Sequence, residues 1–302
     1  MSVSIERVSW AGWPNSYRVT NGEAELILTS DVGPRVIRYG FVGGQNLFLE
    51  LPDQLGGSAE HEFMPRGGHR LWSAPEDLTR TYAADNFPVH ISIQGPSIEA
   101  TAPVEPGSEL RKQIRVRIAG VGSGVTVMHR IENTLAWPID VSAWALTMMA
   151  PGGLGITGFP PRGTHPECLA PTHPLVMWAF SDLSDPRWTF TRKYMLLRQD
   201  VTRPEPTKLG LFNEQTWGAY LLNNELFLKR YDADRSKEYP DFGCSYETFA
   251  NGTTLELETL GPLTRLGPGE KLEHTERWTL HRNVILSDLD DSSLDDVLLP
   301  IL

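Results

Sequence analysis

Four side chains of different chemistry follow the glycine pair at 67–68 within eight positions: His69, Arg70, Trp72 and Glu76. The glycines permit a tight turn or a close backbone approach. An imidazole can donate a proton and a guanidinium can bind hydroxyl oxygens. An indole can stack on a sugar ring, and a carboxylate can accept hydrogen bonds from hydroxyl groups. We therefore interpret this segment as a candidate carbohydrate site. The alternative is a structural loop in which Arg70 and Glu76 form an ion pair over a packed Trp72.

Carboxylates gather in two further segments near the C-terminus. In the segment 241–249, Tyr246 and Glu247 are candidates to line a pocket and bind a substrate. In the segment that follows, Glu256 and Glu258 alternate with apolar residues, so both project from one face of a predicted strand. A solvated face would show the same alternation, whereas carboxylates in a cleft can supply a general base with a raised pKa. The alternation alone does not distinguish the two.

The sequence contains no recognisable metal or cofactor motif. Its eight histidines are scattered without the spacing of a metal site. His129 alternates with Val125, Val127 and Ile131, which is typical of a histidine in a core. A nucleophile elbow, a phosphate loop and a dinucleotide fingerprint are all absent. We therefore predict no metal, no cofactor and no hydrolase triad.

The composition excludes several classes of partner. A formal net charge of −11 over 302 residues argues against a nucleic-acid partner, because nucleic acids are held chiefly by Lys and Arg at phosphates. The basic residues Arg111, Lys112, Arg115 and Arg117 do cluster, and we interpret them as the solvated outer face of a strand. No run of 18 apolar residues occurs, so we expect no membrane partner.

The two cysteines indicate a reducing compartment. Cys168 and Cys244 are the only thiols in the chain, and a chain of this length builds a core without disulfides. The N-terminal residues show neither a basic nor an apolar signal-peptide region. We therefore expect two reduced thiols in a cytoplasmic protein.

Short β-rich segments separated by Gly, Pro, Asn and Asp dominate the chain, and they predict an all-β fold. The clearest candidates are 24–29, 34–42, 88–94, 110–118, 125–133, 139–149, 208–213, 218–222, 225–231, 253–260 and 271–281. In the segment 110–118, apolar Ile114, Val116 and Ile118 alternate with polar residues, which indicates one buried face. So many strands without a fixed repeat predict a large two-sheet sandwich with a sugar-sized cleft.

Residues 1–302 read as one domain, because no low-complexity linker divides them. The Gly- and Pro-rich stretch 152–174 predicts a long loop at one rim of the cleft. The tail 286–302 predicts a short helix that carries Leu289, Leu294 and Leu298, with Asp and Ser residues available to cap it.

Several of these segments resemble the galactose mutarotase-like (aldose 1-epimerase) superfamily, in a poorly characterised branch. The resemblance rests on residues 24–28 with 33–39, on Gly-Gly-Gln-Asn-Leu at 43–47, on Arg-Ile-Glu-Asn at 130–133 through Trp144, and on 254–258 followed by 266–270. It spans most of the chain, although each motif is short. It implies a β-supersandwich of two large antiparallel sheets with few short helices and a sugar site on a concave sheet.

The resemblance also implies roles for residues. In such enzymes a histidine protonates the ring oxygen while a glutamate takes the anomeric proton. Glu258 is the best match to that glutamate, and Arg70 is similar to the substrate-binding arginine. Thr147 stands where the family usually has its histidine. His69 is the candidate to replace it.

These observations lead to a carbohydrate-active protein with alternatives left open. The first is an aldose mutarotase or epimerase acting on a monosaccharide or small sugar derivative, with Glu258 as base, His69 as acid, and Arg70, Trp72 and Glu247 binding the sugar. The second is a carbohydrate-binding protein without catalysis, and the third is a glycoside-cleaving enzyme or lyase on the same fold. The sequence specifies neither the sugar nor the oligomeric state.

Overall fold

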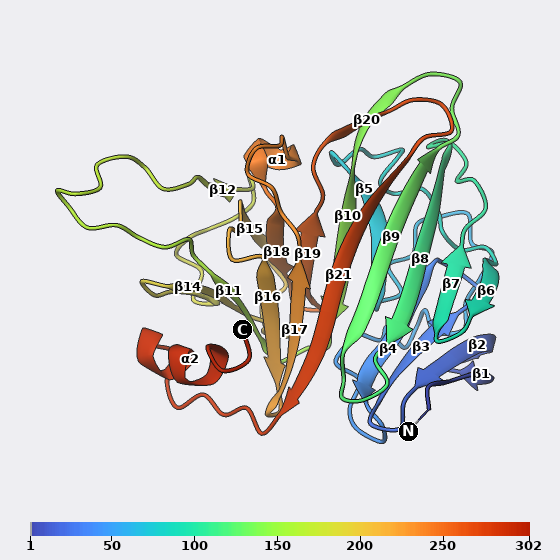
Figure 1. The fold of residues 1–302 in the computed structure, drawn as a ribbon, viewed down its shortest axis with the longest axis horizontal. Helices are drawn as coiled ribbons and strands as arrows, with labels where there is room; N and C mark the ends of the chain where they lie inside the picture. The colour runs from blue at the N-terminus through green and yellow to red at the C-terminus, as the bar shows by residue number, and fades with distance from the viewer. Residues whose placement is uncertain (1) are drawn as a thin grey trace.

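Two large antiparallel β-sheets pack face to face in the computed structural model, which describes residues 2–302 (Figure 1). The first sheet contains, in spatial order, β1 (Ser4–Trp10), β2 (Trp13–Thr20), β3 (Ala24–Thr29), β4 (Arg35–Phe41), β5 (His69–Ala74), β10 (Ile139–Met149), β19 (Leu255–Leu260), β18 (Tyr246–Ala250), β15 (Thr207–Leu211) and β12 (Leu175–Met177), with β20 (Thr264–Leu266) paired to β10. The second contains β13 (Trp188–Phe190), β14 (Tyr194–Arg198), β11 (Leu154–Gly158), β16 (Trp217–Leu222), β17 (Glu225–Tyr231), β21 (Lys271–Arg282), β9 (Val125–Asn133), β8 (Leu110–Ile118), β7 (Ser97–Thr101) and β6 (His90–Gln94). The predicted all-β sandwich is confirmed.

The main hydrophobic core lies between the two sheets and draws residues from both. On β8 and β9 every second residue is buried, as their alternating sequences require. Near the middle of the core, the rings of Tyr39, Phe48, Phe227 and Trp278 pack against one another in edge-to-face and tilted arrangements, with centroids 5.5–6.1 Å apart. This core fixes which face of each strand points inward, and therefore which face is left to form a site.

Two short helices complete the described chain: α1 (Pro240–Gly243) and α2 (Asp291–Leu298). The Asp290 carboxylate caps α2 by accepting a hydrogen bond from the Ser293 amide at 2.8 Å. Leu294 and Leu298 bury the inner face of α2 against the second sheet, and Leu289 packs at the edge of the same cluster. No helix within residues 2–302 is long and apolar enough to cross a membrane.

The stretch 152–174 departs from the expectation of one long loop. Its first part forms β11, an interior strand of the second sheet, between β14 and β16. The pair Gly155 and Gly158 concealed this strand, because both are buried where a side chain would meet a neighbour: Leu255 in one case and Gln215 in the other. The loop begins only after β11, and Figure 1 shows it extending from the edge of the molecule before β12.

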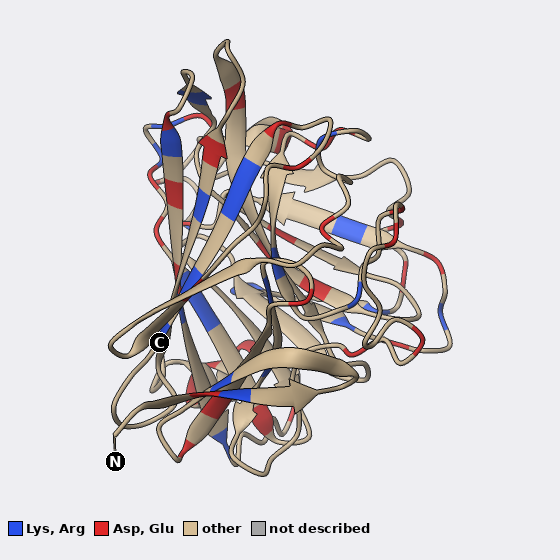
Figure 2. Cartoon of the chain, turned by 90° about the vertical axis from the view of Figure 1, so that its right-hand side faces the viewer, with Lys and Arg blue, Asp and Glu red and all other residues tan. Residues whose placement is uncertain are grey.

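Charged side chains of both signs are interspersed on the strands (Figure 2). The basic cluster on β8 follows this pattern: Arg111 pairs with Glu132 and Arg115 with Glu99 on the outer face. Lys112 departs from the expected solvated face, because it points the other way and pairs with Glu105 in a buried position. Cys168 is exposed and Cys244 is buried, and both thiols are free.

Candidate functional site

A cleft lies on the outer face of the first sheet, the face turned away from the second sheet. Strand β5 is central to it, since the segment after the glycine pair forms a strand in which Arg70 and Trp72 share the outer face. Cross-strand register places Leu146 beside Arg70 and Trp144 beside Trp72 on β10. On β19, Glu256 and Glu258 face the same side, opposite Met148 and Leu146.

The cleft has two adjoining lobes. The first lobe has a volume of about 520 Å³ and is lined by Leu51, Asp53, Gln54, Phe63, Pro65, Arg70, Trp72, Leu146, Met148, Phe249, Asn251, Thr253, Thr254 and Glu256. The second lobe, about 290 Å³, is lined by Trp72, Glu76, Tyr82, Trp144, Trp178, Phe180, Pro206, Lys208, Phe249 and Glu256. Trp72, Phe249 and Glu256 border both lobes, so the two form one continuous site.

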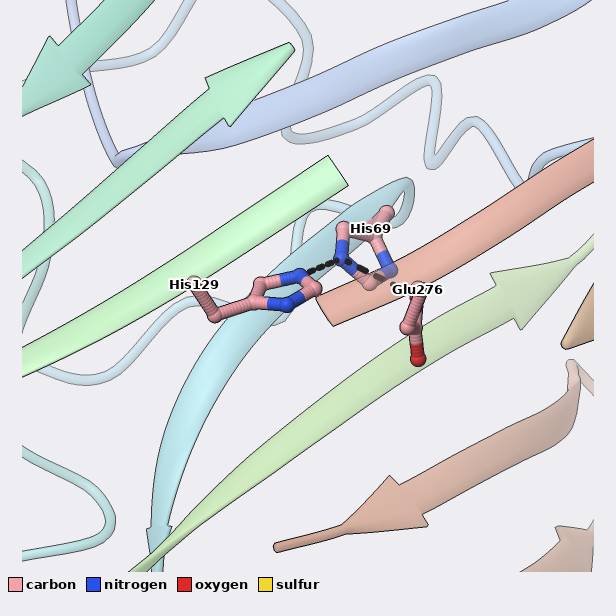
Figure 3. Close-up of side chains that lie close together, drawn as sticks. All are labelled: His69, His129 and Glu276. Carbon is pink, nitrogen blue, oxygen red and sulfur yellow. Dashed lines mark hydrogen bonds and ion pairs between the residues drawn. The ribbon is translucent and has the colours of Figure 1, made fainter. Parts of the chain in front are cut away.

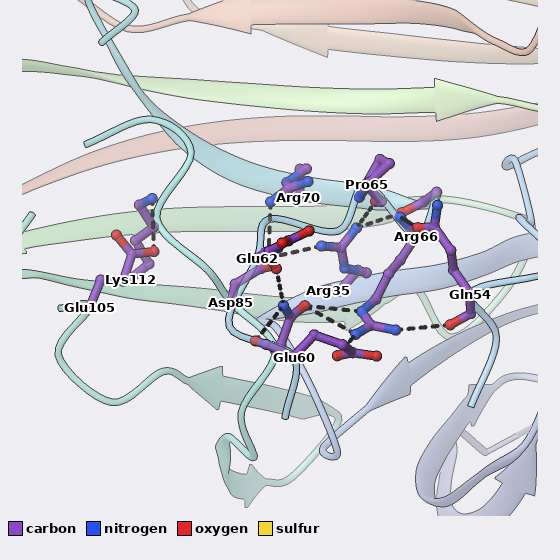
Figure 4. A network of polar contacts seen from close by, with 12 residues as sticks. Arg35, Gln54, Glu60, Glu62, Pro65, Arg66, Arg70, Asp85, Glu105 and Lys112 are labelled. Atoms are coloured by element: carbon purple, nitrogen blue, oxygen red, sulfur yellow. Dashed lines mark hydrogen bonds and ion pairs between the residues drawn. The ribbon is translucent and has the colours of Figure 1, made fainter. Parts of the chain in front are cut away.

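Arg70 is held in the first lobe between two aromatic rings. Its guanidinium carbon lies 4.5 Å from the centroid of Phe63 and 4.8 Å from that of Trp72. Its Nη2 donates to the Asp85 carboxylate at 3.2 Å, and Arg35 donates to the same carboxylate (Figure 4). Burial lowers the pKa of Arg70 to about 9, so the group stays protonated at neutral pH. Its Nε and Nη1 have no hydrogen-bond partner within the described chain, and neither does Nε1 of Trp72.

The predicted structural alternative for this segment required an ion pair between Arg70 and Glu76. The structure instead pairs Arg70 with Asp85, while Glu76 accepts a hydrogen bond from the Tyr82 hydroxyl at the rim of the second lobe. Arg70, Trp72 and Glu76 therefore all border the cleft.

A lysine separates the two deepest carboxylates from the open part of the cleft. Glu247 on β18 and Glu258 on β19 are directly opposite one another, and Lys208 Nζ lies 2.7 Å from an oxygen of each. Like charges at such a cross-strand pair repel, so the ammonium is required to compensate them. Burial would lower the pKa of Lys208, but the two carboxylates outweigh burial and raise it.

Aromatic rings enclose the same lysine. Nζ of Lys208 is 4.6 Å from the ring centroids of Trp144 and Trp178, and Nε1 of Trp144 donates to Glu258 at 2.8 Å. Burial raises the pKa of Glu247 well above its usual range; Lys208 opposes this and Glu258 adds to it. Both glutamates are fully buried beneath Lys208 and line neither lobe, although Oε1 of Glu258 has no hydrogen-bond partner among the described residues.

Glu256 is the carboxyl group that borders both lobes. It is half-buried, opposite Phe249 on β18. Burial and the neighbouring Glu258 raise the pKa of Glu256 to about 8, against the opposing effect of Lys208 and Arg70. At neutral pH it therefore carries a proton and can donate a hydrogen bond or a proton to a ligand.

His69 lies on the other face of the same strand. Because neighbours on a strand point to opposite sides, the imidazole next to Arg70 enters the space between the sheets and is fully buried there. Its Nε2 is 2.6 Å from Nε2 of His129 (Figure 3). Its Nδ1 is 2.8 Å from the Thr147 hydroxyl. Burial and Lys229 lower the pKa of His69 well below its usual range. The structure thus separates the predicted acid from the predicted base by the thickness of the sheet.

The hydrogen bonds around His69 define a neutral network. Nδ1 of His129 lies 2.9 Å from the His274 carbonyl oxygen and must donate to it, so Nε2 of His129 accepts from Nε2 of His69. Nδ1 of His69 then accepts from Thr147. Thr147 itself faces this interior, so a histidine at that position of β10 would also point away from the cleft. The prediction that His129 is a core histidine is confirmed.

His69, His129 and Glu276 are the group closest to a metal-site geometry, with ligand atoms all within 4.8 Å of one another. The donor atoms are already used. Oε1 of Glu276 binds Lys229 Nζ at 3.0 Å, and its Oε2 accepts from Nε1 of Trp278 at 2.8 Å. A cation would displace these contacts next to a buried ammonium, so the residues do not fit a metal and we assign none.

Tyr246, like His69, is a predicted site residue that faces the space between the sheets. It precedes Glu247 on β18 and points into the inter-sheet core, where its hydroxyl and ring lie against Gly218. The sequence did not single out Lys208, Trp144 or Phe63 as site residues. Trp144 and Glu256 were visible as alternating residues on predicted strands, whereas nothing in the sequence distinguishes Lys208 from a surface lysine.

Comparison with solved structures relates this architecture to known proteins. No protein-family model matches the chain, and no curated protein matches it in sequence. Two galactose mutarotase-like proteins superpose well on this chain. The one from Lactobacillus casei ATCC 334 has 8% identity over 88% of this chain and 100% of that chain, with a TM-score of 0.57. The one from Clostridium acetobutylicum has 10% identity over 93% of this chain and 99% of that chain, with a TM-score of 0.55. The chain has the galactose mutarotase-like fold.

A protein from Synechocystis sp. PCC 6803 also superposes on this chain, with 12% identity over 92% of this chain and 99% of that chain and a TM-score of 0.59. The predicted resemblance is thus confirmed at the level of the fold. With identities this low, the mutarotase-like fold alone assigns no chemistry to the cleft. The chemistry of the cleft must be inferred from the residues that line it.

Proposed function

We propose that the protein binds a monosaccharide or a small sugar derivative in the cleft on the outer face of its first sheet. One observation carries the proposal: Arg70 is buried between the rings of Phe63 and Trp72, and two of its nitrogens have no partner within the described chain. Buried donors are almost always satisfied, so an unsatisfied guanidinium at a cavity indicates a ligand with acceptor oxygens. A sugar offers such oxygens at its edge and a C–H face for the rings.

The surrounding residues support a neutral, polyhydroxylated ligand. The first lobe combines apolar floor residues such as Leu146 and Met148 with the short polar side chains of Asn251, Thr253 and Thr254. This mixture of apolar surface and a few polar groups is typical of small-molecule sites. Protonated Glu256 adds a donor between the lobes, so that both donors and acceptors face the cavity.

Calorimetric titration tests the proposal. The wild-type protein is titrated with a panel of aldohexoses, their N-acetylamino derivatives and their methyl glycosides, alongside Phe63→Ala and Trp137→Ala. Phe63 is a half-buried ring of the first lobe, whereas Trp137 is an exposed ring outside both lobes. We expect Phe63→Ala to weaken binding about three- to tenfold, and Trp137→Ala to leave it unchanged. If no sugar of the panel binds, the proposal fails.

The environments of Glu256 and Glu258 favour aldose mutarotation as a second candidate. Neighbouring carboxyl groups with different environments can divide the roles of acid and base. Glu256, with its raised pKa, would protonate the ring oxygen, and Glu258, whose Oε1 has no partner within the described chain, would take the anomeric proton. For this, Lys208 must move aside, because it covers Glu258. His69 has no part in this candidate mechanism.

Exchange between sugar anomers, followed by NMR, distinguishes binding from catalysis. We expect Glu258→Gln and Glu256→Gln each to reduce the accelerated exchange at least a hundredfold if mutarotation occurs. Glu247→Gln is the matched control, because it alters the same lysine contact without removing either proposed catalytic group. Sugar binding by a wild-type protein that does not accelerate exchange would leave the binding function and exclude mutarotation.

A further inference from the structure

The second lobe of the cleft has no role in binding a single sugar ring in the first lobe. It is an adjoining hollow of about 290 Å³, and Trp72, Phe249 and Glu256 border it as well as the first lobe. From this geometry we infer that the cleft binds two linked sugar rings, as a disaccharide or the end of an oligosaccharide, one ring in each lobe. This inference rests on the proposed carbohydrate function and extends it to the size of the ligand.

The two lobes follow one another along the strand direction. On β10, Leu146 and Met148 line the first lobe and Trp144 lines the second. Two residues along a strand advance the chain by about 6.6–6.8 Å. This step is of the size of one sugar ring, so linked rings can occupy both lobes while lying over the same strands.

Each lobe has its own aromatic surface. The first uses Phe63 and Trp72, whereas the second is enclosed by Trp144, Trp178 and Phe180. Phe180 stands at the rim with 47% of its surface exposed and meets the edge of Phe249, with ring centroids 6.4 Å apart. Together with Trp144 and Trp178 it gives the second lobe an aromatic surface on which a sugar ring can stack.

Polar groups are also distributed between the lobes. The first lobe is lined by Arg70, and the second has Lys208 and the rim carboxylate of Glu76. Glu256 borders both lobes, where it can donate to an oxygen between the two rings. One ring would use only half of these groups.

The experiment compares matched monosaccharide and disaccharide ligands by calorimetry. Methyl β-glucoside, methyl β-galactoside and methyl β-mannoside are each compared with the methyl β-glycosides of their β-1,4- and α-1,4-linked dimers. We expect at least one dimer to bind ten times more tightly than its monomer.

Phe180→Ala should weaken binding of that dimer about three- to tenfold while leaving the monomer within twofold. The control is Phe190→Ala, because Phe190 is similarly exposed at 42% but lies on β13, away from the cleft. Phe63→Ala should weaken binding of both the monomer and the dimer.

Two outcomes overturn the inference, and they differ in what they leave standing. If monomers and dimers bind equally and Phe180→Ala behaves like Phe190→Ala, the second lobe takes no sugar ring, but the proposed function holds. If neither monomers nor dimers bind, both the inference and the proposed function fail.

Discussion

Strands β5, β10 and β19 carry polar side chains on both of their faces. Toward the second sheet, His69, Thr147 and Thr259 join His129, His274, Glu276 and Lys229 in a buried network. Toward the cleft, Arg70, Trp72 and Glu258 retain polar atoms without a partner in the described chain. The buried network satisfies itself, whereas the cleft face does not.

This difference separates a structural polar cluster from a candidate site. Buried polar groups cost free energy unless they are hydrogen-bonded, so a complete network stabilises one packing of the sheets. Unsatisfied groups at a cavity persist only where a ligand or water completes them. Although the inner cluster holds three imidazoles and a carboxylate, the outer cluster is therefore the better candidate for function.

The largest expected effect comes from breaking the inner ion pair. Lys229→Met should lower the free energy of unfolding by about 3–5 kcal/mol, because it leaves Glu276 as an uncompensated buried charge. Lys208→Met, the matched change at the cleft, should cost only about 1–3 kcal/mol, since the pKa of Glu247 is already raised well above its usual range and a proton held there lets the two carboxyl groups remain adjacent without the ammonium. Urea unfolding at pH 7.5 measures the free energy of unfolding of both variants. If Lys208→Met lowers it as much as Lys229→Met or more, the contrast between the inner network and the cleft is wrong.

A smaller effect is expected from acidifying the inner network. Burial lowers the pKa of His274 to about 4, against the attraction of Glu276. Below the ordinary value of 6.5 the unfolded chain therefore binds a proton that the folded chain does not. Stability is complete above pH 6.5 and falls as the pH drops toward 4, by about 2 kcal/mol at pH 5 from this one histidine.

Urea unfolding of His274→Gln at pH 7.5 and pH 5 tests this prediction. The variant should lose less stability than wild type between the two pH values, while His165→Gln, at an exposed position, should follow wild type. An identical pH dependence for His274→Gln and wild type would show that the imidazole is not held neutral.

The smallest effect on stability is expected at the cleft, because solvent screens the charge of the half-buried Glu256, and its pH dependence has the opposite sign. Because the pKa of Glu256 is raised to about 8, the folded chain holds a proton that the unfolded chain releases above the ordinary carboxyl value. This contribution is present at low pH and is lost as the pH rises through 8. Glu256→Gln should remove it, and a carbon NMR titration of the Glu256 carboxyl should show a midpoint near 8. A midpoint below 6 would exclude Glu256 as an acid at neutral pH.

Alternation along individual strands could be predicted from the sequence, and with it the sandwich. The apolar positions of 110–118 and 125–133 are the buried ones, and Glu256 and Glu258 do share a face. By contrast, the sequence does not predict β5 as a strand, because the preceding glycine pair and its mixture of His, Arg and Trp are typical of a loop. In a strand, the same alternation places His69 and Arg70 on opposite sides.

From the local sequence it follows that neighbouring residues on each strand point to opposite faces. Which face the second sheet covers depends on long-range packing, and this packing places Arg70 and Trp72 at a cleft and His69 and Tyr246 in the core. It also decided that Lys208, about 50 residues from Glu258 in the chain, lies between two glutamates. The physical reason is that charge pairing and burial act between strands brought together by long-range packing, and the order of those strands is not encoded in any local pattern.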